Sequence, residues 1–231
     1  MTIGRIEKMS KSKKNTVDPS PIVDQYGADA VRWFMLSDSP PERDLPWSEA
    51  GIEGAWRFVQ RLWRLVDTAS EVDGRDPDLD RIVHKTVAAI AGDIEALSFN
   101  KAVARIYELS SAIEKSDINR SRTDAIQALV RIVAPMVPHL AEEAWAKLGN
   151  PGLVADAAWP EVDPALLVDD SVTIAVQVNG KLRDTLTLAK GIARDEAEAA
   201  ALASDKIVRA LDGKTPKKVI VVPDRLVNIV A

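Results

Sequence analysis

The sequence has no cysteine and only two histidines, His84 and His139, among its 231 residues. A chain without thiols forms no disulfide and offers no thiolate ligand to a metal ion. Neither histidine stands at a metal-ligand spacing from other ligand-type residues. We therefore expect both histidines to be structural and expect no metal site.

Long hydrophobic runs are also missing, since no apolar stretch approaches the ~20 residues that a membrane-spanning helix needs. The basic start of the chain has no apolar segment behind it and does not resemble a secretory signal. Apolar residues make up 46% and charged residues 28%, which is typical of a globular protein. These features predict a cytoplasmic protein without a membrane partner, either one large domain or two to three small ones.

The net charge of −5 and the pI near 5.2 argue against a protein that coats nucleic acid indiscriminately. Positive charge is instead concentrated locally. In the first 15 residues Arg5 and four lysines stand against one acid, Glu7, giving a net charge of +4. Lysine carries a compact charge on a flexible stem, so it can follow a phosphate group as it moves. The interspersed Ser and Asn favour turns and supply further hydrogen-bond donors. This pattern predicts a loop that neutralises a polyphosphate in a transition state, with a solvated basic tail as the alternative.

Five residues of this loop, Lys8-Met9-Ser10-Lys11-Ser12, match the KMSKS signature of class I aminoacyl-tRNA synthetases. The following Asp18-Pro19 and Tyr26–Arg32 resemble the leucyl, isoleucyl and valyl subgroup. The resemblance implies ATP as a substrate, with Mg²⁺ arriving on it and no cofactor held tightly by this chain. It also implies that Lys8 and Lys11 steady the triphosphate, Lys11 being the more critical, while Ser10 and Ser12 shape the phosphate-binding loop.

The segment up to residue 47 is expected to hold a short strand over residues 2–6 and two short helices. Ser20 and Pro21 have the residue types of a helix cap and first position, and a second helix should run from Ala28 to Leu36. Arg32 would reach toward the loop or a phosphate, or serve as an ordinary surface residue. Residues 37–47 are predicted to form a linker anchored by Trp47.

Apolar residues then recur at helical spacing, which predicts four long helices and one shorter helix. The expected ranges are 48–70, 78–96, 99–115, 122–135 and 138–147. Short connections between long amphipathic helices predict an antiparallel bundle. In the first helix Arg57, Arg61 and Arg64 share one side, where they would contact an RNA backbone or form a solvated face.

From about residue 171 the pattern changes to alternation with period two, typical of strands. Strands over 172–178 and 181–188 flank Asn179-Gly180, a strong hairpin signal. A helix over 194–211 and strands over 219–222 and 226–230 complete an expected ββαββ domain. Lys181, Arg183, Lys217 and Lys218 are its candidate nucleic-acid contacts. Gly213-Lys214-Thr215 is not a P-loop, because Val208 stands where the first glycine should be.

Two later stretches extend the resemblance. Residues 134–145 resemble the anticodon-type helical domain of class I synthetases, and residues 176–183 resemble the start of the C-terminal domain of bacterial leucyl enzymes. The implied fold is mainly α: a stem-contact segment, an antiparallel anticodon-binding-like bundle and a small α+β domain. The expected divisions are 1–47 for the loop and stem-contact segment, 48–152 for the bundle, 153–170 for a linker and 171–231 for the C-terminal tRNA-binding domain.

The whole chain thus resembles the C-terminal part of bacterial leucyl-tRNA synthetases, which activate leucine with ATP and esterify tRNA(Leu). The HIGH-type motif, nucleotide fold, leucine pocket and editing domain of that family have no counterpart in these residues. We therefore expect a monomer that is inactive alone and works with N-terminal catalytic and editing domains. The alternatives are a freestanding tRNA-binding module without ATP chemistry, an isoleucyl- or valyl-type fragment, and a helical scaffold with no nucleic-acid role.

Overall fold

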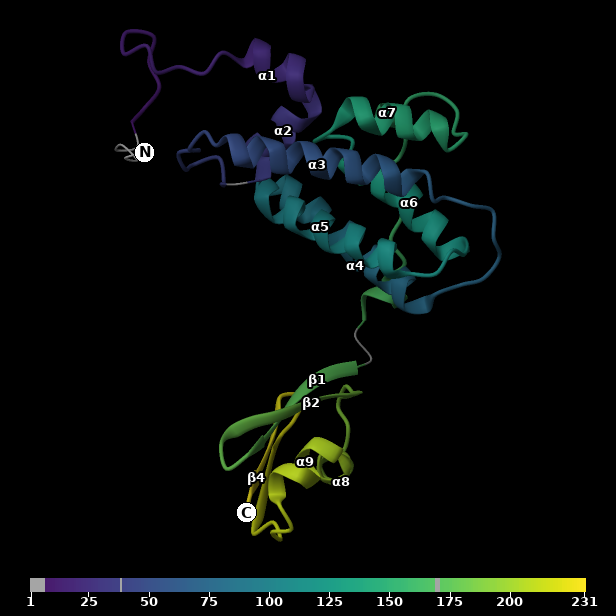
Figure 1. Cartoon of the computed structure of the whole chain (residues 1–231). Helices are drawn as coiled ribbons and strands as arrows, with labels where there is room; N and C mark the ends of the chain where they lie inside the picture. Colours follow the sequence, from purple (N-terminus) through teal and green to yellow (C-terminus); the bar gives the residue numbers. More distant parts are fainter. Residues whose placement is uncertain (1–6, 38, 169–170) are drawn as a thin grey trace. The chain divides into compact units, whose positions relative to one another are not determined.

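The computed structural model describes residues 7–37, 39–168 and 171–231. The chain forms two compact units, Met1–Leu167 and Val168–Ala231, which are described separately below (Figure 1). The strand expected over residues 2–6 lies outside the described residues.

The first unit is helical, as predicted. Its helices are α1 (Pro19–Tyr26), α2 (Ala28–Ser37), α3 (Glu49–Val66), α4 (Pro77–Glu95), α5 (Phe99–Lys115), α6 (Arg120–Val133) and α7 (Pro138–Lys147), followed by the 3-10 turns η1 (Val154–Asp156) and η2 (Pro164–Leu167). Helix α3 ends at Val66 rather than near residue 70, and α6 begins two residues earlier than expected.

Side-chain caps fix where these helices begin. Ser48 accepts a hydrogen bond from the N–H of Gly51 at the start of α3, and Asn119 accepts one from the N–H of Arg122 at the start of α6. The predicted cap of α1 was wrong. Asp18, not Ser20, is the N-cap residue, because its carboxylate accepts from the N–H of Ser20 and Pro19 already holds a helical φ.

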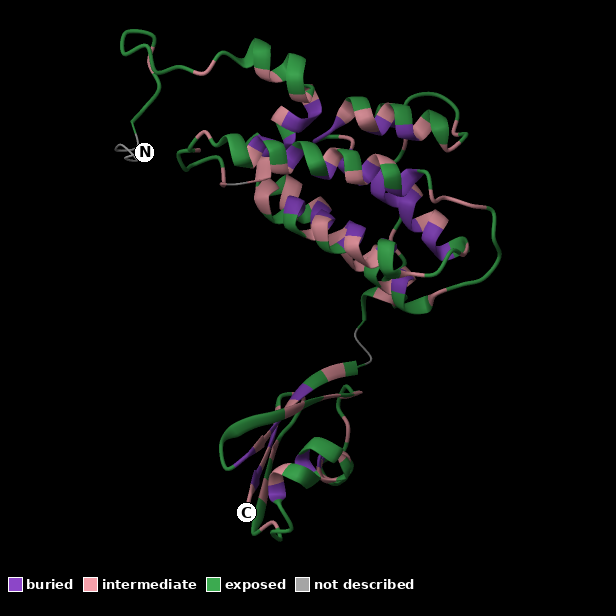
Figure 2. Cartoon of the chain, viewed as in Figure 1, coloured by how far each residue is buried: buried purple, intermediate pink, exposed green. Residues whose placement is uncertain are grey.

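An aromatic cluster lies at the centre of the helical unit. The Trp33 ring stacks on Phe58 with ring centroids 4.8 Å apart, and its Nε1–H donates to the Tyr107 hydroxyl at 3.1 Å. Trp47 packs edge-on against Phe34 at 5.4 Å, which confirms that it anchors the preceding linker. Figure 2 shows buried residues gathered where α3, α5 and α6 meet.

Residues 154–167 pack onto the bundle within the same unit. Val154 is part of the helical core, and the Glu142 carboxylate accepts from the N–H groups of Val154 and Ala155. Further along, His84 Nδ1 accepts from the N–H of Asp163 at 3.0 Å. The four functional divisions expected from the sequence stay a prediction, while the chain's first compact unit extends to Leu167.

The second unit confirms the ββαββ order. It contains β1 (Ser171–Val178), β2 (Lys181–Ala189), α8 (Arg194–Ala203), α9 (Asp205–Leu211), β3 (Lys218–Val222) and β4 (Leu226–Val230). The sheet order is β2-β1-β4-β3, with two antiparallel hairpins joined by a parallel β1–β4 pair. The single helix expected over 194–211 is two helices, because Ser204 is extended and donates its hydroxyl to Asp184.

The turn between β1 and β2 has the geometry that its sequence predicts. Asn179 and Gly180 both have positive φ, 51° and 78°, as a two-residue hairpin turn requires. In β1 every second residue from Ile174 is buried, and α8 and α9 cover that face of the sheet. The described helices include none that is long and apolar enough to cross a membrane.

Candidate phosphate loop and nucleic-acid surfaces

The lysine-rich stretch forms a closed turn. Asn15 bridges its two ends: its Oδ1 accepts from the N–H of Ser10 at 2.8 Å, and its Nδ2 donates to the Lys8 carbonyl at 3.3 Å. The Ser10 hydroxyl lies 3.1 Å from the Ser12 hydroxyl and accepts from the N–H of Lys13. The two serines therefore make their hydrogen bonds within the turn.

The lysines of this loop differ in their availability. Lys13 pairs with Glu7 at 3.1 Å, whereas Lys8, Lys11 and Lys14 are exposed and pair with no carboxylate among the residues that the structure describes. Lys8 borders a hollow of about 570 Å³ whose opposite wall is residues 44–47. Lys11 begins the turn, where its carbonyl accepts from the N–H of Lys14. The unpaired ammonium groups of Lys8 and Lys11 fit a polyphosphate.

The arginine row of α3 is less uniform than its spacing predicts. Arg61 forms a two-bond ion pair with Glu114 of α5, at 2.6 and 2.7 Å, and also donates to the Ser111 hydroxyl. These bonds hold the pKa of Glu114 below its usual range and raise that of Arg61. Arg57 lies 3.7 Å from Glu53, and Arg64 is exposed without an ion pair in the described part of the chain. Arg64 is therefore the most available cation of the three.

Arg32 is exposed, as the surface alternative predicted, and its hydrogen bonds within the described residues go to backbone carbonyls rather than to the lysine loop. Its Nε donates to the Met136 carbonyl at 3.0 Å and its Nη2 to the Pro135 carbonyl at 2.7 Å. On the same helix Asp29 lies 2.8 Å from His139 Nδ1. No local sequence pattern indicates these contacts, because the partners are more than 100 residues apart.

The basic residues of the second unit lie at one end of its sheet but on opposite edge strands. Lys181 and Arg183 are on β2, and Lys218 begins β3, with Lys217 just before it. Three strand spacings separate the two edges, which is about 14 Å. All four side chains are exposed. The structure therefore brings them together as two groups flanking one end of the sheet.

Next to Arg183 on β2, the Asp184 carboxylate is fully hydrogen-bonded. Lys206 Nζ at 2.8 Å and the Ser204 hydroxyl at 2.5 Å donate to its carboxylate and lower its pKa to about 2. Lys206 is thus neutralised locally and adds little to the positive charge that this end of the sheet offers.

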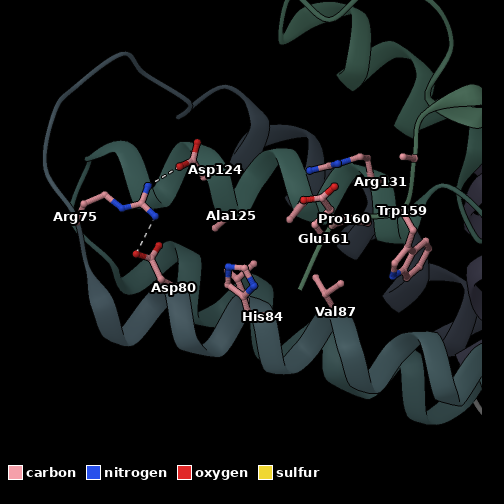
Figure 3. A pocket seen from close by; sticks show the side chains of 13 residues that line it. Arg75, Asp80, His84, Val87, Asp124, Ala125, Arg131, Trp159, Pro160 and Glu161 are labelled. Atoms are coloured by element: carbon pink, nitrogen blue, oxygen red, sulfur yellow. Dashed lines mark hydrogen bonds and ion pairs between the residues drawn. The ribbon is translucent and has the colours of Figure 1, made fainter. Parts of the chain in front are cut away.

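A polar hollow of about 380 Å³ lies between α4, α6 and residues 158–161 (Figure 3). Arg75 bridges Asp80 and Asp124 at one end of it, at 3.0 and 2.6 Å. Arg131 lines the other end, and burial lowers its pKa. Sequence reasoning missed this cluster, because its members come from separate segments and have no shared spacing. The described residues contain no group of three or more His, Asp or Glu side chains that could hold a metal ion.

Family comparisons agree with this architecture. Residues 76–199 match the anticodon-binding domain of tRNA ligase, and residues 4–48 match the class I tRNA synthetases of the I, L, M and V group. A leucine–tRNA ligase from Rhizorhabdus wittichii is 73% identical over 230 residues, covering 100% of this chain and 28% of that protein. One from Novosphingobium aromaticivorans is 69% identical, covering 99% of the chain and 27% of that protein.

A solved structure is also similar. The ternary complex of Agrobacterium radiobacter K84 agnB2 LeuRS with tRNA and LeuAMS matches with a TM-score of 0.77 and 29% identity, covering 96% of this chain and 31% of that one. The chain therefore spans less than a third of the length of these relatives. Because the family match covers more than half of its residues, the chain belongs to the family of anticodon-binding domains of tRNA ligases.

Proposed function

We propose that this chain is the tRNA-docking part of a leucine–tRNA ligase, which activates leucine with ATP and esterifies tRNA(Leu). The observation that carries the proposal is the 73% identity with a leucine–tRNA ligase along the whole chain. The freestanding module and the isoleucyl or valyl assignments are less well supported, since the relatives quoted above share one specificity.

In this proposal Lys8 and Lys11 contact the phosphates of ATP. Their ammonium groups carry no competing carboxylate among the described residues, and Ser10 and Ser12 keep the turn closed around them. They act by electrostatic stabilisation as negative charge moves onto the leaving pyrophosphate. Mg²⁺ accompanies ATP in this reaction and shares in neutralising its phosphates. No side chain of the loop forms a covalent intermediate in this scheme.

The surfaces proposed for tRNA are Arg57 and Arg64 on α3 and the two basic groups of the second unit. Arg61 belongs to the same row but is held by Glu114. Phosphate contacts fix register without reading sequence. Because protein synthesis takes place in the cytoplasm, we place the chain there, as a monomer that depends on catalytic and editing domains for activity.

The test of tRNA docking is binding of the chain to tRNA(Leu), and to a tRNA with a short variable arm, across a salt series. We expect tighter binding of the long-armed tRNA and affinity that falls as salt rises. Arg64→Gln should reduce the salt slope by about one unit. Arg61→Gln is the matched control, because its charge is already paired with Glu114 and its loss should leave the slope nearly unchanged.

The ATP role is tested separately in the leucine–tRNA ligase that carries this segment. Lys11→Ala should slow leucine-dependent ATP–pyrophosphate exchange by about 10²–10³-fold, as loss of one transition-state donor does. Lys13→Ala is the control, since Lys13 is paired with Glu7. Equal rates for the two variants would contradict the proposal and favour a module without ATP chemistry.

A further inference from the structure

Helix α7 has its N-terminus capped by a residue from a distant helix. Val137 occupies the N-cap position and has no polar side chain to offer. The Asp29 carboxylate of α2 takes over this role: it accepts from the N–H of Leu140 at 2.7 Å and from the N–H of His139 at 3.4 Å. It also lies 2.8 Å from His139 Nδ1. A buried carboxylate at a helix N-terminus is favourable both as a hydrogen-bond acceptor and as a charge.

One helical turn further along α2, Arg32 binds the opposite kind of group. Its guanidinium donates to the carbonyls of Pro135 and Met136, which follow the end of α6. Arg32 thus binds free carbonyls that follow α6, and Asp29 binds free N–H groups at the start of α7. Together they form a clamp, defined here as Asp29 and Arg32 on the turn at 135–140, that fixes α2 against this turn and the start of α7. Figure 1 shows α2 beside the start of α7.

The clamp stands close in the chain to the lysine loop. Helix α1 joins α2 directly through Gly27, whose φ of 85° sets the angle between the two helices. The loop ends at Asn15, four residues before α1 begins. The direction of α2 therefore sets the position of α1 relative to the bundle. It also sets where the chain leaves the lysine loop, since the loop ends just before α1.

We propose that Asp29 and Arg32 are positioning residues that hold the loop-bearing segment at one fixed angle to the helical bundle. This inference rests on the proposed function. The clamp keeps the phosphate loop at a fixed position relative to a tRNA bound on the bundle. A buried arginine elsewhere provides the contrast. Arg122 donates to the carbonyls of Ile113 and Ser116 and to the Thr68 hydroxyl, so it secures the ends of α5 and α3 to α6 without a bond to α1 or α2.

The first test measures geometry in the 231-residue chain itself. Because the chain has no cysteine, spin labels can be placed at Asp24→Cys on α1 and Glu143→Cys on α7 without background. Pulsed dipolar spectroscopy should give one narrow distance in the parent. Asp29→Asn and Arg32→Gln should broaden or shift it, and Arg32→Lys, which can keep one of the two bonds, should do so less. A label pair at Gln60→Cys and Glu143→Cys should stay narrow throughout.

The Arg122→Gln variant separates positioning from stability. It should lower Tm while the Asp24–Glu143 distance stays narrow. If Asp29→Asn and Arg32→Gln likewise lower Tm but leave that distance unchanged, the clamp is only a stabilising contact and the proposal is overturned.

The second test uses the leucine–tRNA ligase that carries this segment. Asp29→Asn should lower kcat for tRNA charging by about 10²-fold, the loss that a misplacement near 1 Å can cause, while leucine-dependent ATP–pyrophosphate exchange is retained. Equal losses in both reactions would overturn the proposal that the clamp positions the loop relative to the bound tRNA. An unsubstituted enzyme that shows no leucine-dependent exchange would overturn the proposed function instead, and the distance measurement would still decide the clamp.

Discussion

The cores of the two units of this chain consist of different residue types. All six tryptophans, three phenylalanines and two tyrosines lie before residue 160, in the helical unit, whereas residues 168–231 contain no aromatic residue. The helical core centres on the Trp33–Phe58 stack, and the second core is aliphatic. Aromatic pairs add about 0.5–1.5 kcal/mol beyond the area they bury, and a domain near 60 residues is marginal. We therefore expect the units to unfold separately, the second one first.

The largest expected effect tests the aromatic side of this comparison. Trp33 is fully buried, so Trp33→Ala should cost about 3–5 kcal/mol of unfolding free energy and also leave the Tyr107 hydroxyl without its donor. Chemical denaturation followed by tryptophan fluorescence measures it. Amide hydrogen exchange in β1 and β4 should be unchanged, and a parallel loss of protection there would show that the units are coupled.

A smaller effect is expected from the aliphatic side. Ile229 of β4 is fully buried, and Ile229→Ala should cost about 2–5 kcal/mol. Hydrogen exchange of the second unit should report this loss, while tryptophan fluorescence should not detect it. Ile220→Ala is the matched comparison, because Ile220 is 39% exposed and the change should cost less than Ile229→Ala.

The smallest expected effect is a pH dependence of stability that belongs to the second unit alone. The pKa of Asp184 is lowered to about 2 in the folded chain by Lys206 and Ser204. The folded state therefore prefers the ionised carboxylate, so this contribution is complete above about pH 4 and is lost as pH falls toward 2. In the parent, the unfolding free energy of the second unit should fall between pH 5 and 2.5. Asp184→Asn should make this fall smaller, as measured by hydrogen exchange. Glu196→Gln, an exposed acid of α8, should leave this fall as in the parent.

Local patterns in the sequence predicted most elements of the fold. The helical periodicity of α3 to α7, the alternation of β1 and the Asn179-Gly180 turn depend on neighbours within a few residues, and the structure confirms them. The choice between Asp18 and Ser20 as a cap was missed, because both residue types suit the position and Pro19 decides between them.

Contacts between distant segments were beyond the reach of such patterns. The Arg61–Glu114 pair joins residues 53 positions apart, and the clamp on the turn at 135–140 spans more than 100. Spacing placed Arg61 on a solvent-facing row but gave no information about the acid on α5. For the lysine loop, the sequence supplied the residue types, while the structure supplied the Asn15 bridge that closes it.

The parallel pairing of β1 with β4 has a consequence for how fast the second unit folds. Each hairpin joins neighbouring strands and should form within about 1–10 μs. The pair at the centre of the sheet joins Ala175 to Leu226, so it requires closing a long stretch of chain that includes α8 and α9. Non-local pairing slows folding. We expect the union of two preformed hairpins to be the rate-limiting step, so substitutions at the β1–β4 seam should slow folding more than substitutions within either turn.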